Sequence, residues 1–134
     1  MSFEPEIIPV DSSDRIRNTS TPYMQLRLNG NSYVNKRAAR MLGIDHGSML
    51  RFYQTGDPKI WFISNDEHLG AGLRKVSGLY KFCDVVIVRK VFKAFGIEGT
   101  RADFPLAAEV EKRLGPDGEE ITVLFIKPHP YNIK

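Results

Sequence analysis

The sequence predicts a mainly β protein that contains short helices. Runs that alternate in polarity or are rich in β-branched residues predict strands, as at 23–28 and 121–126. Turn-forming sequences such as Asn29-Gly30-Asn31 separate these runs. Two short stretches, 36–42 and 89–95, are expected to be helical, and each is followed by Gly-Ile, where the glycine favours a left-handed C-terminal cap.

The first half of the chain, residues 22–64, has the element order β-β-α-β-β. We expect a helix at 36–42 and strands at 23–28, 32–34, 49–53 and 60–63. Asn35 precedes the helix and can cap it. Trp61 and Phe62 lie in the last of these strands and are expected in the core.

A linker at 64–72 precedes a second stretch, 73–127, in which the same order is expected to return. Its elements are a helix at 89–95 ending at Gly96 and strands at 73–82, 84–88, 102–110 and 121–126. Pro105 favours an edge position or a bulge. We expect the two units to form one compact domain, flanked by a flexible arm at 1–21 and a tail at 128–134.

A shift of 53 positions, from Lys36 to Arg89, superposes KRAARMLGI at 36–44 on RKVFKAFGI at 89–97. The matched pairs are Lys36 with Arg89, Arg37 with Lys90, Arg40 with Lys93, Gly43 with Gly96, and Val34 with Ile87. A fixed period of this kind indicates a repeated structural unit. It predicts a positive φ at both Gly43 and Gly96.

The composition indicates a globular protein. The 134 residues are 42% hydrophobic and 26% charged, enough to bury a core without disulfides. A single cysteine, Cys83, excludes an internal disulfide and is expected to be a small buried residue. The acidic, proline-containing start is unlike a signal peptide, and no run approaches the roughly 20 apolar residues of a membrane helix. We therefore expect a cytoplasmic protein without a membrane partner.

Residues 30–63, GNSYVNKRAARMLGIDHGSMLRFYQTGDPKIWFI, contain a glycine turn, a short strand, a helix ending in Leu-Gly-Ile, a second glycine turn and a β-hairpin. This segment resembles the swapped-hairpin DNA-binding domain of the AbrB/MazE-like family, also called the SpoVT-AbrB type. The residues that carry the resemblance are Gly30, Arg40, Leu42, Gly43, Ile44, Gly47, Leu50 and 60–63. The second half of the chain matches only loosely.

The resemblance implies a swapped-hairpin β-barrel, which in that family is built from two interleaved chains. If both halves carry the unit, one chain supplies the whole barrel as a pseudo-dimer. Three positions depart from the family pattern. Asn35 replaces a proline, and Asn31 and Ala39 replace cations that contact DNA in the family, so that Arg40 alone is retained.

The cations of the two helices are the candidate binding residues. These are Lys36, Arg37, Arg40, Arg89, Lys90 and Lys93. Two basic helices could neutralise duplex phosphates, and Arg27, Arg51, Arg74 and Lys75 could extend that surface. The alternative is that these side chains form the solvated face of two amphipathic helices. The net charge of +3 permits either interpretation.

We expect no enzymatic activity, cofactor or metal, because no acid pair, nucleophile motif or metal-ligand spacing occurs. The first functional hypothesis is a duplex-DNA-binding regulator or antitoxin-like protein. The second is a protein–protein adaptor that keeps the fold without DNA contact, and a homo-oligomer or a protein partner fits either. The discriminating question is whether the two cation triplets share one face. The first hypothesis predicts that replacing Arg37, Arg40, Lys90 and Lys93 with Ala abolishes DNA binding.

Overall fold

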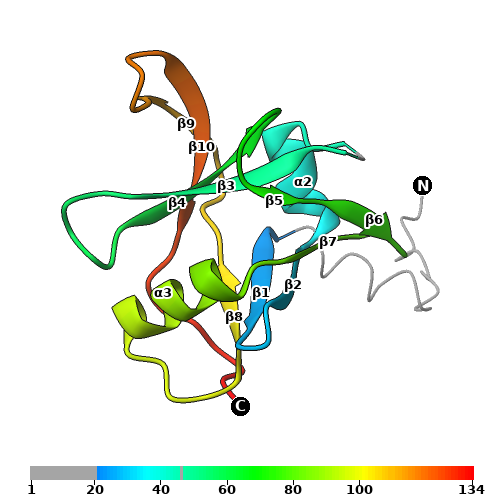
Figure 1. Ribbon diagram of the computed structural model, residues 1–134, viewed down its shortest axis with the longest axis vertical. Helices are drawn as coiled ribbons and strands as arrows, with labels where there is room; N and C mark the ends of the chain where they lie inside the picture. Colours follow the sequence, from blue (N-terminus) through cyan, green and yellow to red (C-terminus); the bar gives the residue numbers. More distant parts are fainter. Residues whose placement is uncertain (1–20, 46) are drawn as a thin grey trace, which may run out of the picture.

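The computed structural model, which describes residues 21–45 and 47–134, is built on two five-stranded antiparallel sheets. The predicted N-terminal arm lies, except for Thr21, outside the described residues. The mainly β class is confirmed, but neither sheet is closed into a barrel (Figure 1). In the described part of the chain, no helix is long and apolar enough to cross a membrane.

The first sheet, called sheet I, has the strand order β6-β7-β2-β1-β8. Its strands are β1 (Tyr23–Arg27), β2 (Asn31–Val34), β6 (Arg74–Val76), β7 (Leu79–Cys83) and β8 (Arg101–Pro105). The second, sheet II, has the order β5-β3-β4-β10-β9. Its strands are β3 (Met49–Gln54), β4 (Trp61–Asp66), β5 (Ala71–Gly72), β9 (Glu111–Leu114) and β10 (Glu120–Ile126). The helices are α2 (Lys36–Leu42) and α3 (Val85–Phe95).

The core lies between the inner faces of the two sheets and the helices. Sheet I places Met24, Leu26, Val34 and Phe104 in the core. Gln25 and Asp103 alternate with them and project from the other side of the sheet, although both are buried at 8% exposure. Sheet II contributes Ile63, Leu124 and Ile126 to the same cluster. Each such side chain contributes about 1.5–3 kcal/mol of burial free energy. The prediction that Trp61 and Phe62 are core residues is confirmed.

Helix α2 has the predicted bounds and both predicted caps. The Asn35 side chain accepts a hydrogen bond from the Ala38 backbone N–H at 3.0 Å. Gly43 has φ +68° and Gly96 has φ +66°, which confirms the two predicted left-handed caps. A Cβ at either glycine would meet nothing within 4 Å. The backbone angle, and not crowding, is therefore what favours glycine there.

Helix α3 corrects the prediction of a strand at 84–88. Asp84 accepts a hydrogen bond from the Ile87 N–H at 3.0 Å and caps a helix that begins at Val85. Val88, Val91 and Phe92 are buried, at the i, i+3, i+4 spacing of one helix face. The cap and this apolar stripe outweigh the β propensity of the valines, which is a weak, context-dependent preference.

Sheet I also corrects the single strand predicted at 73–82. Ser77 (φ +52°) and Gly78 (φ +83°) form a tight turn that divides it into the β6–β7 hairpin. Positive φ at both central residues is typical of the hairpin turns whose twist matches that of the strands. The linker predicted at 64–72 is largely occupied by β4 and β5. The strand predicted at 102–110 ends at Pro105 as β8, and β9 was not predicted.

The two halves of the chain are interleaved. Strands β2 and β7 pair antiparallel at the centre of sheet I, β1 pairs with β8, and β4 pairs with β10 in sheet II. The shift of 53 holds over the C-terminal part of the two helices and their glycine caps, where Ala39 corresponds to Phe92 and Gly43 to Gly96, but not at the start of the helices. The N-caps, Asn35 and Asp84, are 49 positions apart because α3 has 11 residues and α2 has 7. The alignment of Val34 with Ile87 is therefore wrong, since one lies in β2 and the other in α3.

The C-terminal segment lies along the outer edge of β8. Backbone hydrogen bonds join Tyr131 to Asp103 in both directions, at 2.8 and 2.9 Å, and Lys134 to Arg101 at 3.0 and 3.1 Å. This pairing satisfies backbone groups that an edge strand would otherwise expose.

Candidate functional site

The outward-facing side of sheet I, here called the outer face, carries two cross-strand rows of side chains. The first row crosses all five strands and contains Asp103, Gln25, Tyr33, Lys81 and Arg74. In the second row Arg101 lies opposite Arg27, and Asn31 lies opposite Cys83. Directly paired residues project from the same face of a sheet. Each row thus brings residues that are far apart in sequence onto one surface.

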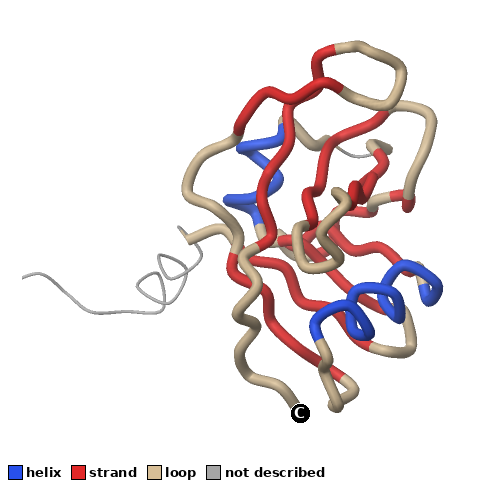
Figure 2. Tube along the Cα trace, turned by 90° about the vertical axis from the view of Figure 1, so that its left-hand side faces the viewer, coloured by secondary structure: helices blue, strands red, loops and turns tan. Residues whose placement is uncertain are grey.

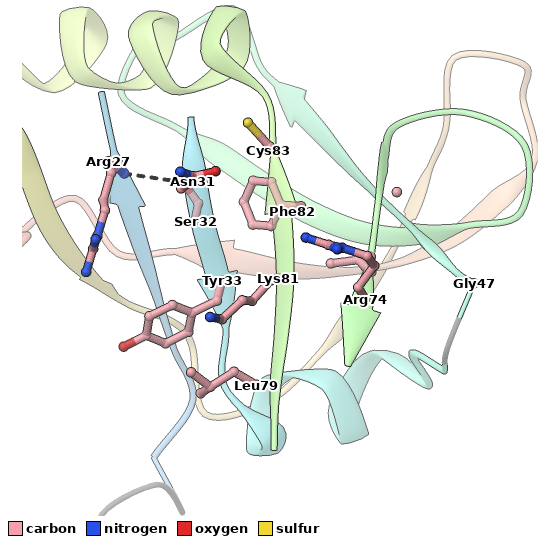
Figure 3. A pocket seen from close by; sticks show the side chains of 12 residues that line it. Arg27, Asn31, Ser32, Tyr33, Gly47, Arg74, Leu79, Lys81, Phe82 and Cys83 are labelled. Carbon is pink, nitrogen blue, oxygen red and sulfur yellow. Dashed lines mark hydrogen bonds between the residues drawn. The ribbon is translucent and has the colours of Figure 1, made fainter. Parts of the chain in front are cut away.

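A hollow of about 760 Å³ lies against this surface (Figure 3). Among its lining residues are Arg27, Asn31, Tyr33, Arg74, Lys81 and Cys83. Figure 3 shows Tyr33 and Lys81 side by side on neighbouring strands. Within the described part of the chain, no Asp or Glu lines the hollow. Its lining therefore combines basic, amide and phenol groups with apolar side chains, namely Leu73, Leu79 and Phe82.

The cations on this face lie close to other cations. Lys81 is the direct cross-strand partner of Arg74, and Arg27 is that of Arg101. Like charges at directly opposed positions destabilise a sheet. Within the described residues the ion pairs are Arg51–Asp66 and Arg113–Glu111, so none of these four cations is neutralised by one. The face is consequently suited to an anionic partner.

A chain of hydrogen bonds positions Arg27. Its Nε donates to Gln25 Oε1 at 3.2 Å, and Gln25 Nε2 donates to Asp103 Oδ1 at 2.9 Å. Asp103 Oδ2 accepts from Asn132 Nδ2 at 3.0 Å. Both Asp103 oxygens are thus engaged by amides, and the carboxylate sets which end of the Gln25 amide faces Arg27. Asp103 is the one acid of the first row, and it acts there as a positioning group.

Tyr33 of the first row contacts a second tyrosine, Tyr23, on the neighbouring strand β1. The hydroxyls of Tyr23 and Tyr33 lie 3.1 Å apart, and the rings meet edge to face with centroids 5.9 Å apart. Burial and the hydrogen bond with Tyr33 raise the pKa of Tyr23 well above its usual range. Burial and the charge of Asp103 raise the pKa of Tyr131 as well. At physiological pH Tyr23 and Tyr131 are neutral phenols that can both donate and accept a hydrogen bond.

The structure does not bring the two predicted cation triplets together. All six helix cations are exposed, but α2 and α3 lie on opposite sides of the molecule in both views (Figures 1 and 2). Arg89 alone among the six lines a hollow shared with sheet cations, a second one of about 550 Å³ that contains Arg27 and Arg101. The other five line neither of the two hollows.

Two of the four residues expected to extend the basic surface belong to the outer face, and two do not. Arg27 and Arg74 line the larger hollow. Arg51 pairs with Asp66 and stacks on Tyr53 in sheet II, at 5.1 Å from the ring centroid. Lys75 lies over the ring of Tyr80, on the opposite side of sheet I.

Sequence reasoning missed Lys81, Tyr33 and Arg101. The prediction of one strand over 73–82 did not include the turn after Val76. Without that turn, the alternation in β7 could not be recognised, in which Lys81 is exposed between the buried Tyr80 and Phe82. The Ser77-Gly78 pair is the sequence signal that could have indicated this hairpin turn. Cys83, expected to be buried, is exposed and lines the larger hollow, because it follows Lys81 on the outward side.

The described residues contain no group of three or more His, Cys, Asp or Glu side chains able to hold a metal ion. No family model matches the chain, and searches of curated proteins and of solved structures find no match either.

Proposed function

We propose that this chain is a DNA-binding protein that contacts duplex phosphates through the outer face of sheet I. The observation that carries the proposal is the two pairs of opposed like charges, Lys81–Arg74 and Arg27–Arg101, which share one face and have no ion-pair partner among the described residues. Neutralising phosphates with such cations releases counterions, which supplies most of the affinity of non-specific DNA binding.

The surface has groups for both parts of DNA recognition. Cations hold the phosphate backbone and fix orientation, whereas base edges are distinguished by hydrogen bonds. Asn31 is exposed beside the cations, and an asparagine amide can pair with an adenine edge.

The proposal includes the AbrB-like swapped-hairpin fold, formed as a single-chain pseudo-dimer. The interleaving of β1–β2 between β7 and β8 supports it, as does the central pairing of β4 with β10. The biological role that we propose for this DNA binding is that of a transcriptional regulator or an antitoxin-like protein. The contact surface is assigned to the sheet, with Arg89 at its margin.

Two multiple variants separate the sheet surface from the helix surface. The sheet variant is Arg27→Ala, Arg74→Ala and Lys81→Ala combined. The helix variant is Arg37→Ala, Arg40→Ala, Lys90→Ala and Lys93→Ala combined, and it removes more charge. Binding of a fluorescent mixed-sequence duplex is measured by anisotropy at several salt concentrations, with folding checked by circular dichroism.

We expect wild-type binding to weaken steeply with salt. The sheet variant should lose more affinity than the helix variant, and its log–log salt slope should fall by about 3, close to one per cation removed. A greater loss in the helix variant would move the site to the helices. Absence of wild-type binding even at low salt would reject DNA binding.

The second candidate function is a protein–protein adaptor, which one observation favours. The β9–β10 hairpin projects from the body of the molecule (Figure 1), and all four residues of β9 are exposed. Leu114 at its end is 78% exposed. An open strand edge with an apolar side chain is a common site for strand addition by a partner.

A further inference from the structure

The second hollow lies where the turn after β1, the second turn of α3 and the start of β8 meet. Four cations line it: Arg27, Arg89, Arg101 and Lys134. They come from three elements and the C-terminal segment, so the fold itself gathers them. None of the Asp and Glu residues that the structure describes lines this hollow.

Two features of Arg101 indicate that the hollow is built for an anion. It lies directly opposite Arg27 across β1 and β8, an arrangement that is unfavourable for two like charges. Its Nε is buried and has no hydrogen-bond partner within the described residues. A buried charged donor without an acceptor is costly. An anion in the hollow would offset both this cost and the repulsion between the two arginines through its charge.

The rim of the hollow is held by backbone hydrogen bonds. The Leu28 N–H donates to Thr100 O at 2.8 Å, which ties the turn after β1 to the start of β8. The Lys134 O accepts from the backbone N–H of Thr100 and of Arg101, at 2.6 and 3.1 Å. A rim held in this way keeps the arginines near one another before any ligand arrives, which lowers the entropic cost of binding.

We propose that this hollow binds a phosphate group. Guanidinium forks match the oxygen geometry of phosphate and hold it by paired, charge-assisted hydrogen bonds. The phosphate could come from two sources. The first is a backbone phosphate of bound DNA, and for this source the inference rests on the proposed function. Arg27 lines both hollows, so a strand that crosses the outer face would reach this site next. The other source is a free phosphate or a phosphorylated small molecule.

Titration with inorganic phosphate tests the site without DNA. Amide resonances of the ¹⁵N-labelled full chain are followed by NMR as phosphate is added, against sodium chloride at equal ionic strength. We expect saturable shifts around Arg89, Thr100 and Arg101 with phosphate only. Arg89→Ala should weaken the apparent affinity at least about 10-fold, because it removes one fork. Lys93→Ala removes an exposed cation from the same helix outside the hollow and should leave the affinity unchanged.

Arg101→Lys serves as a second variant that keeps the charge but loses the fork, and it should also weaken phosphate binding. Shifts that are linear and equal for chloride and phosphate would overturn the inference. So would equal phosphate affinity in Arg89→Ala and the wild type.

Duplex-binding measurements on the same variants distinguish the two sources of the phosphate. If the source is DNA, Arg89→Ala should lower the salt slope of duplex binding by about 1, whereas Lys93→Ala should not. Saturable phosphate binding without any duplex binding would reject the proposed function and assign the site to a free or small-molecule phosphate. Duplex binding without saturable phosphate shifts would reject this inference and leave the proposed function standing.

Discussion

Asn35 shows how much a single buried side chain can organise. It is fully buried, accepts from the backbone N–H of Tyr23 at 3.2 Å and of Ala38 at 3.0 Å, and donates to Thr21 O at 2.8 Å. It therefore caps α2 and also fixes the start of β1. Asp84 makes the corresponding cap of α3 with one side-chain hydrogen bond, to the Ile87 N–H.

This difference gives a prediction for matched variants. Asn35→Ala should lower the free energy of unfolding by about 2–4 kcal/mol, since it removes a cap and leaves buried backbone groups unpaired. Asp84→Ala should cost only about 1 kcal/mol, the ordinary value for a cap. Urea denaturation followed by circular dichroism measures both. Equal losses in the two variants would contradict the organising role of Asn35.

At the scale of elements, each helix ends at a glycine with left-handed angles, although the helices differ in length. The Gly43 N–H bonds to carbonyls of Ala39 and Arg40, and that of Gly96 bonds to those of Phe92 and Lys93. Such a cap stops a helix at a defined residue and directs the chain toward the next strand.

Substitution at Gly96 tests whether the backbone angle is the reason for the glycine. Gly96→Ala should destabilise the protein by about 1 kcal/mol, because an L-residue is strained at this φ while open space surrounds its Cβ. Gly96→Asn should cost less, since asparagine tolerates the left-handed region. The midpoint of urea denaturation compares the two. A larger loss with Asn than with Ala would contradict this explanation.

Elements were predicted well where local chemistry decides them and poorly where packing does. The bounds of α2 follow from Asn35, its apolar positions and Gly43, which are all local. Residues 84–88 have strong β propensity, yet Val88 packs in the core as part of a helix. Burial of one face of α3, where Phe92 meets Phe104 of sheet I, is a tertiary effect, and propensity alone does not include it.

At the scale of the whole molecule, neither half of the chain can complete its own sheets. Strand β1 pairs with β8 from the second half, and β10 from that half pairs with β4. The core cluster likewise contains residues from both halves, such as Met24 and Phe104. A small set of strands without these partners would be marginal in water.

Fragment complementation tests this dependence. Chains covering 1–66 and 67–134 divide the protein in the exposed stretch after β4. We expect neither fragment to be a folded monomer by NMR at low micromolar concentration, because each lacks the strands that cover its core. An equimolar mixture should recover a dispersed spectrum close to that of the intact chain. A stably folded monomer of 1–66 would contradict the interleaved arrangement.

The sequence by itself determined the local features: the mainly β class, the Asn35 cap, the left-handed glycines at 43 and 96 and the burial of Trp61 and Phe62. These depend on neighbours along the chain and on apolar periodicity. Only the tertiary structure decided that Lys81 and Arg74 share a face with Arg27 and Arg101, and that α2 and α3 lie apart. The physical reason is that strand pairing joins residues distant in sequence, so which cations meet depends on register and on the order of strands in the sheet.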